Sequence, residues 1–221
     1  MSPFRLTLLI GGATSRTRIL GFLRDVLLAA LFGAGSVADA FFVALRIPNL
    51  VRRLMGEGGW TGAYVPIATK LIDTDNLTRE ASLIRDSLVY VSLLAASLVL
   101  IGEIWASNII KILAPGMSQD RYDLAVLYFR ALMPLAFGAT LTSLLSAILI
   151  SQKRFTLQAV VPVSVNVVLV LILVYFNIYG SSDYTKVGLF LSLAASAATF
   201  VQVFLLLIPV TFRFDKSFFT R

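Results

Sequence analysis

Long apolar stretches separated by short polar connections make up most of the chain. A membrane-spanning helix needs about 20 mostly apolar residues to cross about 30 Å of hydrocarbon. By that measure the sequence contains six candidate spans, at about 6–32, 38–66, 87–110, 124–151, 156–178 and 187–210. The pattern therefore predicts an all-α membrane protein with about six transmembrane helices.

The polar connections between these stretches are short, and none is a low-complexity tract. They occupy 33–38, 73–80, 114–123, 151–155 and 177–186. The first span has a charged start and an apolar run, as a signal peptide has. It lacks a convincing A-x-A cleavage site, and its apolar pattern continues to Phe32. We interpret it as a retained span.

The second stretch is too long for one straight span, because a continuous helix over 39–70 would exceed the bilayer at about 1.5 Å per residue. Pro48 should kink it, and the glycines at 56–59 should interrupt it. In the fifth span, Pro162 and Asn166 are expected to mark a kink and an interhelical hydrogen bond. In the fourth span, small and hydroxyl residues are expected to pack helices together, namely Gly138, Thr140, Thr142, Ser143 and Ser146.

Composition supports a membrane protein and excludes several kinds of chemistry. Hydrophobic residues make up 58% of the chain, charged residues make up 14%, and the mean hydropathy is +0.87. Soluble domains have about 45–50% apolar and about 25% charged residues. The sequence has no Cys and no His, which removes thiol nucleophiles, disulfides, imidazole bases and the usual zinc and haem ligands. We therefore expect no enzyme activity, no metal site and no cofactor.

The net charge of +7 is distributed in a way that predicts orientation. A basic membrane protein more often faces anionic lipid or an anionic solute than nucleic acid. With a cytoplasmic N-terminus, nine basic residues fall on the cytoplasmic side and three on the opposite side. This matches the positive-inside bias of membrane proteins, so both termini are predicted to be cytoplasmic.

Charged residues inside the first span share one helical face. At about 100° per residue, Asp25 lies about 20° from Arg18, and Arg24 lies about 120° from it in the same sense. Gly21 falls between them and would let a backbone or a bulky solute approach. Arg16 points the opposite way and is interpreted as an anchor at the cytoplasmic interface.

A similar face runs along the second span. Asp39, Phe42, Arg46, Asn49 and Arg53 share an arc of about 80°, with Arg52 about 60° beyond it. Structural explanations stay open for single residues. Asp39 can close a capping box with Ser36, Arg46 and Arg53 can pair or reach an interface, and Asp25 can neutralise a neighbouring arginine.

For Arg18, Arg24 and Arg52 together, acidic partners are too few to cancel the positive charge. An arginine at the centre of a span costs about 2.5–3.5 kcal/mol on insertion scales, so several of them need a compensating reason. A cationic cavity inside a membrane protein indicates an anionic ligand, and guanidinium groups bind phosphate through paired hydrogen bonds. We therefore predict a phosphate-binding cavity.

The run at 17–66 closely resembles the opening of the lipid II flippase family, MurJ (also called MviN). The resemblance rests on R-x-L-G-F-x-R-D at 18–25, FGAG at 32–35, ADAFFVA at 38–44, IPNLVRRL at 47–54 and an EG…VP pattern at 57–66. LAPG at 113–116 and KRF…P at 153–162 are similar to later family landmarks. Thr17, where serine is frequent, and GEGGW, where AEGAF is typical, are modest departures.

The resemblance implies a two-lobe bundle of the multidrug/oligosaccharidyl-lipid/polysaccharide exporter superfamily, located in the bacterial cytoplasmic membrane. Family members flip lipid II, the lipid-linked peptidoglycan precursor, by alternating access during cell-wall synthesis. The expected partners are lipid II and membrane lipids, and not nucleic acid. By this resemblance Arg18, Arg24 and Arg52 line a cationic cavity that receives the pyrophosphate. Supporting or gating roles are expected for Asp25, Asp39, Arg53 and Glu57.

Residues 1–221 are similar to the N-terminal lobe alone, and the C-terminal lobe is absent from them. We expect a fragment, a truncated product, or a chain that works with a second chain. Two other functions stay open. The chain could be a non-transporting membrane partner whose arginines only hold helices together, or an exporter of another polyprenyl-pyrophosphate-linked glycan. A cationic cavity argues against export of cationic drugs.

Overall fold

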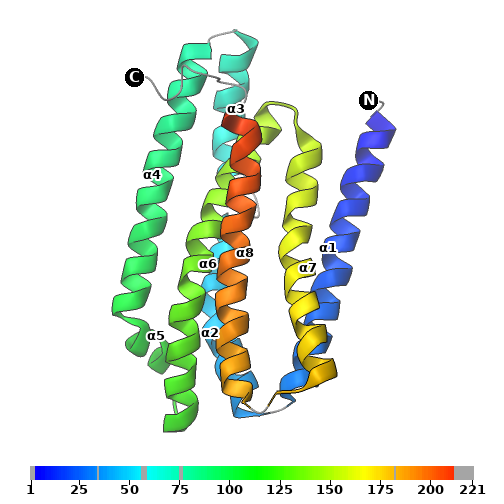
Figure 1. Ribbon diagram of the computed structural model, residues 1–221. Helices are drawn as coiled ribbons and strands as arrows, with labels where there is room; N and C mark the ends of the chain where they lie inside the picture. The colour runs from blue at the N-terminus through cyan, green and yellow to red at the C-terminus, as the bar shows by residue number, and fades with distance from the viewer. Residues whose placement is uncertain (1–2, 34, 56–58, 75–76, 182, 212–221) are drawn as a thin grey trace.

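The structure is a computed structural model that describes residues 3–33, 35–55, 59–74, 77–181 and 183–211, with side chains except those of 3–17, 155–162 and 211. These residues form eight α-helices (Figure 1). The helices are α1 (Pro3–Phe32), α2 (Ser36–Leu54), α3 (Trp60–Asp73), α4 (Leu77–Ile104), α5 (Ala106–Leu113), α6 (Gln119–Ser151), α7 (Phe155–Tyr179) and α8 (Tyr184–Thr211). The prediction of an all-α fold is confirmed.

Two of the six predicted stretches each contain two helices. In the second stretch α2 ends at Leu54 and α3 begins at Trp60, while most of the predicted GEGG break, at 56–58, lies outside the described residues. Pro48 stays inside α2. In the third stretch the chain passes from α4 to α5 at Trp105. The prediction of 87–110 missed the first turns of α4, because its charged residues lower the hydropathy without interrupting the backbone hydrogen bonds.

Three helical segments among the described residues are long and apolar enough to cross a membrane. They are Leu77–Ile104, Gln119–Ser151 and Tyr184–Val210, and Val163–Tyr179 of α7 is a shorter apolar helix. α2, with 19 residues, is not among them, because it carries one carboxylate and three arginines. The charges that point to a cavity are therefore the same charges that weaken the hydropathy signal.

The central helix of the bundle is α6, which packs against α8, α2, α4 and α3 (Figure 1). α1 packs mainly against α7, and α7 packs against α8. One apolar cluster joins α2, α6 and α8 around Phe41, Phe129 and Leu191. A second joins α3, α4, α6 and α8 around Ile84, Leu145 and Leu206. These two clusters hold the helices that surround the functional site.

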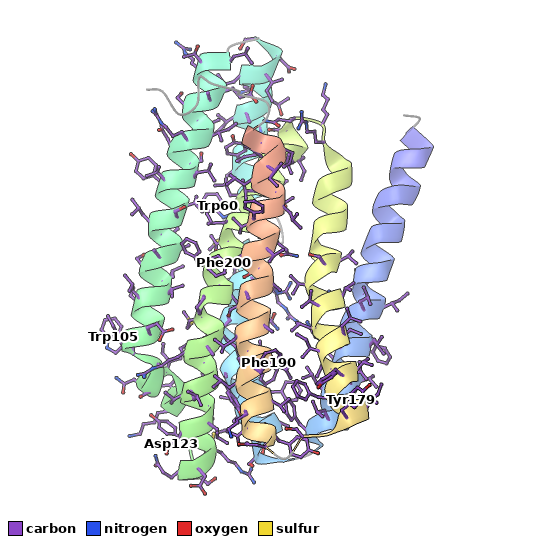
Figure 2. The ribbon with its side chains drawn as sticks, viewed as in Figure 1. Trp60, Trp105, Asp123, Tyr179, Phe190 and Phe200 are labelled. Carbon is purple, nitrogen blue, oxygen red and sulfur yellow. The ribbon has the colours of Figure 1, made fainter. Side chains whose placement is uncertain are left out.

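Many large apolar side chains are exposed on the outer surface, as expected of a surface that faces lipid. α4 exposes a series of large apolar side chains, namely Val89, Tyr90, Leu93, Leu94, Leu100, Ile101 and Ile104. Trp105 and Tyr179 are exposed near the same end of the bundle (Figure 2). Tryptophan and tyrosine favour the boundary between hydrocarbon and water, so these side chains mark one membrane interface.

α6 and α8 approach closely through small residues. A Cβ atom built on Gly138 would lie 2.7 Å from Cβ of Thr199, and one on Gly188 would lie 2.7 Å from Cζ of Tyr128. The Ser196 hydroxyl donates a hydrogen bond to the Ala131 carbonyl across this contact, at 2.7 Å. The predicted packing role of Gly138 is thus confirmed.

Asp183 caps the start of α8, and this gives a first testable prediction. Its Oδ1 accepts hydrogen bonds from the backbone N–H groups of Thr185 (3.1 Å) and Lys186 (3.2 Å). The pKa of Asp183 is held below its ordinary value. The hydrogen bond from the backbone N–H of Lys186 contributes most, followed by the hydrogen bond from the Lys186 side chain. Asp183→Ala should therefore lower thermal stability slightly at neutral pH, because the cap is lost.

The pH dependence follows from the sign of this shift. A carboxyl whose pKa is depressed by folding stabilises the protein above its unfolded pKa, and that contribution disappears as the pH falls below about 4. The difference in melting temperature between wild type and Asp183→Ala should be largest near pH 7 and shrink in acid. Asp183→Asn keeps a capping acceptor and should melt close to wild type at neutral pH. Equal melting of wild type and the alanine variant at pH 7 would contradict the assignment.

Candidate functional site

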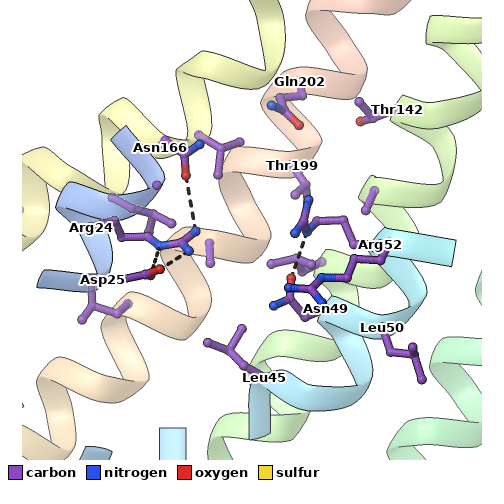
Figure 3. A pocket seen from close by; sticks show the side chains of 18 of the residues that line it. Arg24, Asp25, Leu45, Asn49, Leu50, Arg52, Thr142, Asn166, Thr199 and Gln202 are labelled. Atoms are coloured by element: carbon purple, nitrogen blue, oxygen red, sulfur yellow. Dashed lines mark hydrogen bonds and ion pairs between the residues drawn. The ribbon is translucent and has the colours of Figure 1, made fainter. Parts of the chain in front are cut away.

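A large cavity lies where α1, α2, α6, α7 and α8 face one another, and its volume is about 830 Å³ (Figure 3). Its apolar lining comes from side chains such as Leu28, Phe41 and Leu169. Its polar lining falls into two parts. A cationic part comes mainly from α1 and α2, and a neutral hydrogen-bonding part comes mainly from α6, α7 and α8.

The cationic part contains four arginines. Arg24 comes from α1, and Arg46, Arg52 and Arg53 come from α2. Asp25 is the one carboxylate in the lining of this cavity, among the residues that the structure describes. Four guanidinium groups and one carboxylate give the lining a net charge of +3, which agrees with the predicted excess of positive charge.

Arg24 is held from two helices. Its Nε and Nη2 donate to Oδ1 of Asp25 at 3.0 and 2.8 Å, and its Nη1 donates to Oδ1 of Asn166 in α7 at 3.3 Å. The side chains of Arg24 and Asp25 are 33% and 59% exposed. The interhelical hydrogen bond predicted for Asn166 is therefore confirmed.

Two of the α2 arginines, Arg52 and Arg46, also donate hydrogen bonds to uncharged acceptors. Arg52 donates from Nε to Oδ1 of Asn49, one turn earlier in α2, at 3.0 Å. Arg46 donates from Nη1 to the carbonyl of Leu113, at the end of α5, at 3.0 Å. Figure 3 shows Arg24 and Asp25 on one side of the cavity and Arg52 with Asn49 on the other. Guanidinium groups from two helices thus face a common space.

The neutral part of the lining is rich in hydroxyl and amide groups. It includes Thr142, Ser143, Ser146, Asn166, Thr199 and Gln202. Ser143 donates to the carbonyl of Met55 at 2.5 Å, while the buried hydroxyl of Thr142 has no hydrogen-bond partner among the described residues. The prediction that Thr142, Ser143 and Ser146 pack helices was incomplete, because all three also line the cavity.

The predicted substrate-binding residues do not all reach this cavity. Arg24 and Arg52 line it, together with Asp25 and Arg53. Arg18 is exposed and lies outside the lining. It precedes Arg24 by six residues, about 9 Å along the helix axis. Helical periodicity describes rotation about the helix axis and leaves out this axial distance, so the binding role of Arg18 stays a prediction.

Asp39 and Glu57 are the other two residues with predicted supporting or gating roles, and the structure describes only Asp39. Asp39 accepts a hydrogen bond from Nη1 of Arg121 in α6 at 2.8 Å, away from the cavity lining. The alternative of a capping box with Ser36 is wrong, because the N-cap of α2 is Gly35 and no side chain caps the helix. Glu57 lies outside the described residues. Asp39 therefore ties α2 to α6, and its gating role stays a prediction.

Sequence reasoning missed Thr199 and Gln202 of α8. The available signal was Gln202, the single amide of α8, because such a side chain in a membrane span needs a polar partner or a polar space. As for metals, the described residues contain no group of three or more Asp and Glu side chains that could hold an ion.

Comparisons with known proteins give one consistent family. A family model described as "Lipid II flippase MurJ" matches residues 28–217. The probable lipid II flippase MurJ of Rhizobium tropici is 30% identical over 213 residues, which cover 95% of this chain and 40% of that protein. The lipid II flippase MurJ of Burkholderia cenocepacia is 36% identical over 169 residues, which cover 76% of this chain and 33% of that protein.

A solved structure of a lipid II flippase MurJ in an inward closed conformation has the same fold. Its TM-score is 0.75 at 23% identity, over 92% of this chain and 42% of that chain. The chain spans between a third and about two fifths of the length of the curated relatives that it matches. The apolar helices and the family match together identify an integral membrane protein. The chain therefore belongs to the lipid II flippase MurJ family.

Proposed function

We propose that this chain takes part in flipping lipid II across the bacterial cytoplasmic membrane, as the N-terminal lobe of an alternating-access transporter. The observation that carries the proposal is the cavity within an apolar helical bundle, lined by four arginines and one carboxylate. Charge of this density inside a membrane protein is costly unless a ligand or partner compensates it. A lipid-linked pyrophosphate supplies the negative charge that this lining lacks.

The arginines suit a pyrophosphate better than a single small anion. Each guanidinium presents several N–H donors in a plane and can bind phosphate oxygens in pairs. Arg24 and Arg52 approach from different helices (Figure 3), so two phosphate groups of one ligand could each meet one arginine. The neutral hydroxyl and amide groups of α6, α7 and α8 are suited to the uncharged, hydrogen-bonding parts of a glycan or peptide.

The proposed mechanism is conformational and involves no covalent step. A fixed anion site that opens in turn to either side of the membrane transports its ligand without chemical change. We propose that residues 1–221 supply one side of this site and that a second lobe or a second chain supplies the other. The partial coverage of the curated relatives supports this division. The distribution of basic residues supports cytoplasmic termini.

Ligand selectivity tests the proposal. The purified gene product that contains this chain would be examined by native mass spectrometry with four lipids. These are lipid II, undecaprenyl pyrophosphate, undecaprenyl monophosphate and phosphatidylglycerol. We expect both pyrophosphate lipids to bind more strongly than the monophosphate, and phosphatidylglycerol to bind weakest. Binding of phosphatidylglycerol as strong as that of both pyrophosphates would reject the anion site. Stronger binding of undecaprenyl pyrophosphate than of lipid II would favour the alternative, an exporter of another polyprenyl-pyrophosphate-linked glycan.

A further inference from the structure

Arg24 is held in part by the carboxylate of Asp25, but three further acceptors of the cavity arginines are of another kind. Asn166 accepts from Arg24, Asn49 accepts from Arg52, and the Leu113 carbonyl accepts from Arg46. All three acceptor oxygens belong to uncharged amides. An amide oxygen can fix the direction of a guanidinium group and leave its charge intact, whereas a carboxylate fixes it and also neutralises it.

We infer that Asn166 is a positioning residue, which orients the Arg24 guanidinium toward an anionic ligand in the cavity. This inference rests on the proposed function of that cavity as an anion site. Asn166 acts through Arg24. It lies in α7 and meets the guanidinium group from a different helix than α1, which carries Arg24 (Figure 3).

The hydrogen bonds of Arg24 leave donors for a ligand. A guanidinium group has five N–H donors. Asp25 takes one donor from Nε and one from Nη2, and Asn166 takes one from Nη1. One N–H therefore remains on each of Nη1 and Nη2, which is the number that a bidentate phosphate contact uses. Contacts from two helices hold the guanidinium group in place before a ligand arrives.

Asp25 alone would not fix Arg24 to the same extent. It is the next residue in α1, and its side chain is 59% exposed, so water screens the ion pair. Asn166 reaches Arg24 from a second helix across 142 positions of sequence. The position of the guanidinium group relative to α7 and the rest of the cavity therefore depends on Asn166.

A second asparagine on the same helix provides a matched comparison. Asn177 also joins α7 to α1, because its Nδ2 donates to the carbonyl of Leu27 at 3.2 Å. It follows Asn166 by 11 positions, three helical turns or about 16 Å, on nearly the same face of α7. Asn177 is exposed and lies outside the cavity lining. Removing Asn177 should weaken the α1–α7 contact without touching Arg24.

The test measures two quantities on the purified gene product that contains this chain, reconstituted in nanodiscs. These are the dissociation constant for inorganic pyrophosphate and the melting temperature. Asn166→Ala should weaken pyrophosphate binding about 5-fold, because Arg24 loses one of its anchors. Asn177→Ala should change the same dissociation constant by less than about 2-fold, because the hydrogen bond of Asn177 does not involve the Arg24 guanidinium group.

Asn166→Asp separates positioning from helix packing. The new carboxylate has nearly the same shape and would bind Arg24 more strongly than the amide does, so the melting temperature should stay equal or rise. It would also place a second carboxylate beside Arg24, in addition to Asp25, and compete with the ligand, so pyrophosphate binding should weaken about 10-fold. A merely structural hydrogen bond would not produce opposite changes in stability and affinity.

The outcomes distinguish this inference from the proposed function. Tight pyrophosphate binding by wild type that is unchanged in Asn166→Ala and Asn166→Asp would overturn the role of Asn166 and leave the anion site intact. Equal losses in Asn166→Ala and Asn177→Ala would also overturn it, because they would indicate a general α1–α7 contact. Failure of the wild-type protein to bind pyrophosphate would overturn both proposals.

Discussion

Replacing Arg24 and Arg52 together by alanine is expected to abolish complementation of a flippase-depleted strain. Hydrogen bonds to charged groups contribute about 1.5–3 kcal/mol each, so losing both guanidinium groups should weaken pyrophosphate binding by about 100-fold or more. The variants would be introduced into the gene that contains this chain and expressed at the normal level. Each single alanine variant should slow growth, since both arginines line the same cavity.

Two further variants sharpen this experiment. Lysine at either position keeps the charge but loses the planar pair of donors, so growth should lie between that of wild type and that of the alanine variant. Arg85→Ala is the matched control. Arg85 is an exposed residue of α4 that pairs with Asp86 and lies outside the cavity lining. Undiminished growth with Arg24→Ala and with Arg52→Ala would reject their role in binding pyrophosphate.

A large loss of thermal stability is expected when Gly138, where α6 meets α8, is replaced by alanine. A methyl group at this position would overlap the side chain of Thr199 and approach its backbone carbonyl carbon to 3.3 Å. Overpacking of this kind costs about 1–3 kcal/mol, which exceeds the helix propensity of about 1 kcal/mol that alanine gains over glycine. Gly138→Ala should therefore lower the melting temperature of the protein in detergent.

Gly62 of α3 is the matched control, because a Cβ atom built there meets nothing within 4 Å. Gly62→Ala should raise the melting temperature slightly, so the same substitution is expected to have opposite signs at the two glycines. Thr199 also lines the cavity. Gly138→Ala should consequently weaken pyrophosphate binding as well. A melting temperature at or above that of wild type for Gly138→Ala would contradict the close contact of α6 and α8.

The sequence allowed the general fold to be predicted, because apolar runs of the length of a bilayer leave few alternatives to helices. It predicted the limits of individual helices less well. α4 begins ten residues before the predicted span, at Leu77, through a charged segment that hydropathy excludes. Local hydropathy measures where lipid contacts the chain, whereas helix limits depend on backbone hydrogen bonds that also continue into water.

The candidate site was predicted in part for a related reason. Helical periodicity placed Arg24 and Asp25 near one face, and both line the cavity. It also included Arg18, which lies outside the lining. Periodicity describes rotation about one helix axis and contains no information about which other helix lies opposite. For that reason the hydroxyl of Thr142 was assigned to packing, although it lines the same cavity.

The pairing of α1 with α7 has a consequence for biosynthesis. Arg24 leaves the ribosome 142 residues ahead of Asn166, a delay of roughly 7 to 28 s at about 5–20 residues per second. During this interval the charged first helix has none of its α7 contacts. We expect it to insert poorly when expressed alone in a glycosylation-based insertion assay, and to insert better when Arg24 and Asp25 are replaced by leucine. Assembly in the cell should then depend on an insertase that shelters α1 until the seventh helix has been translated.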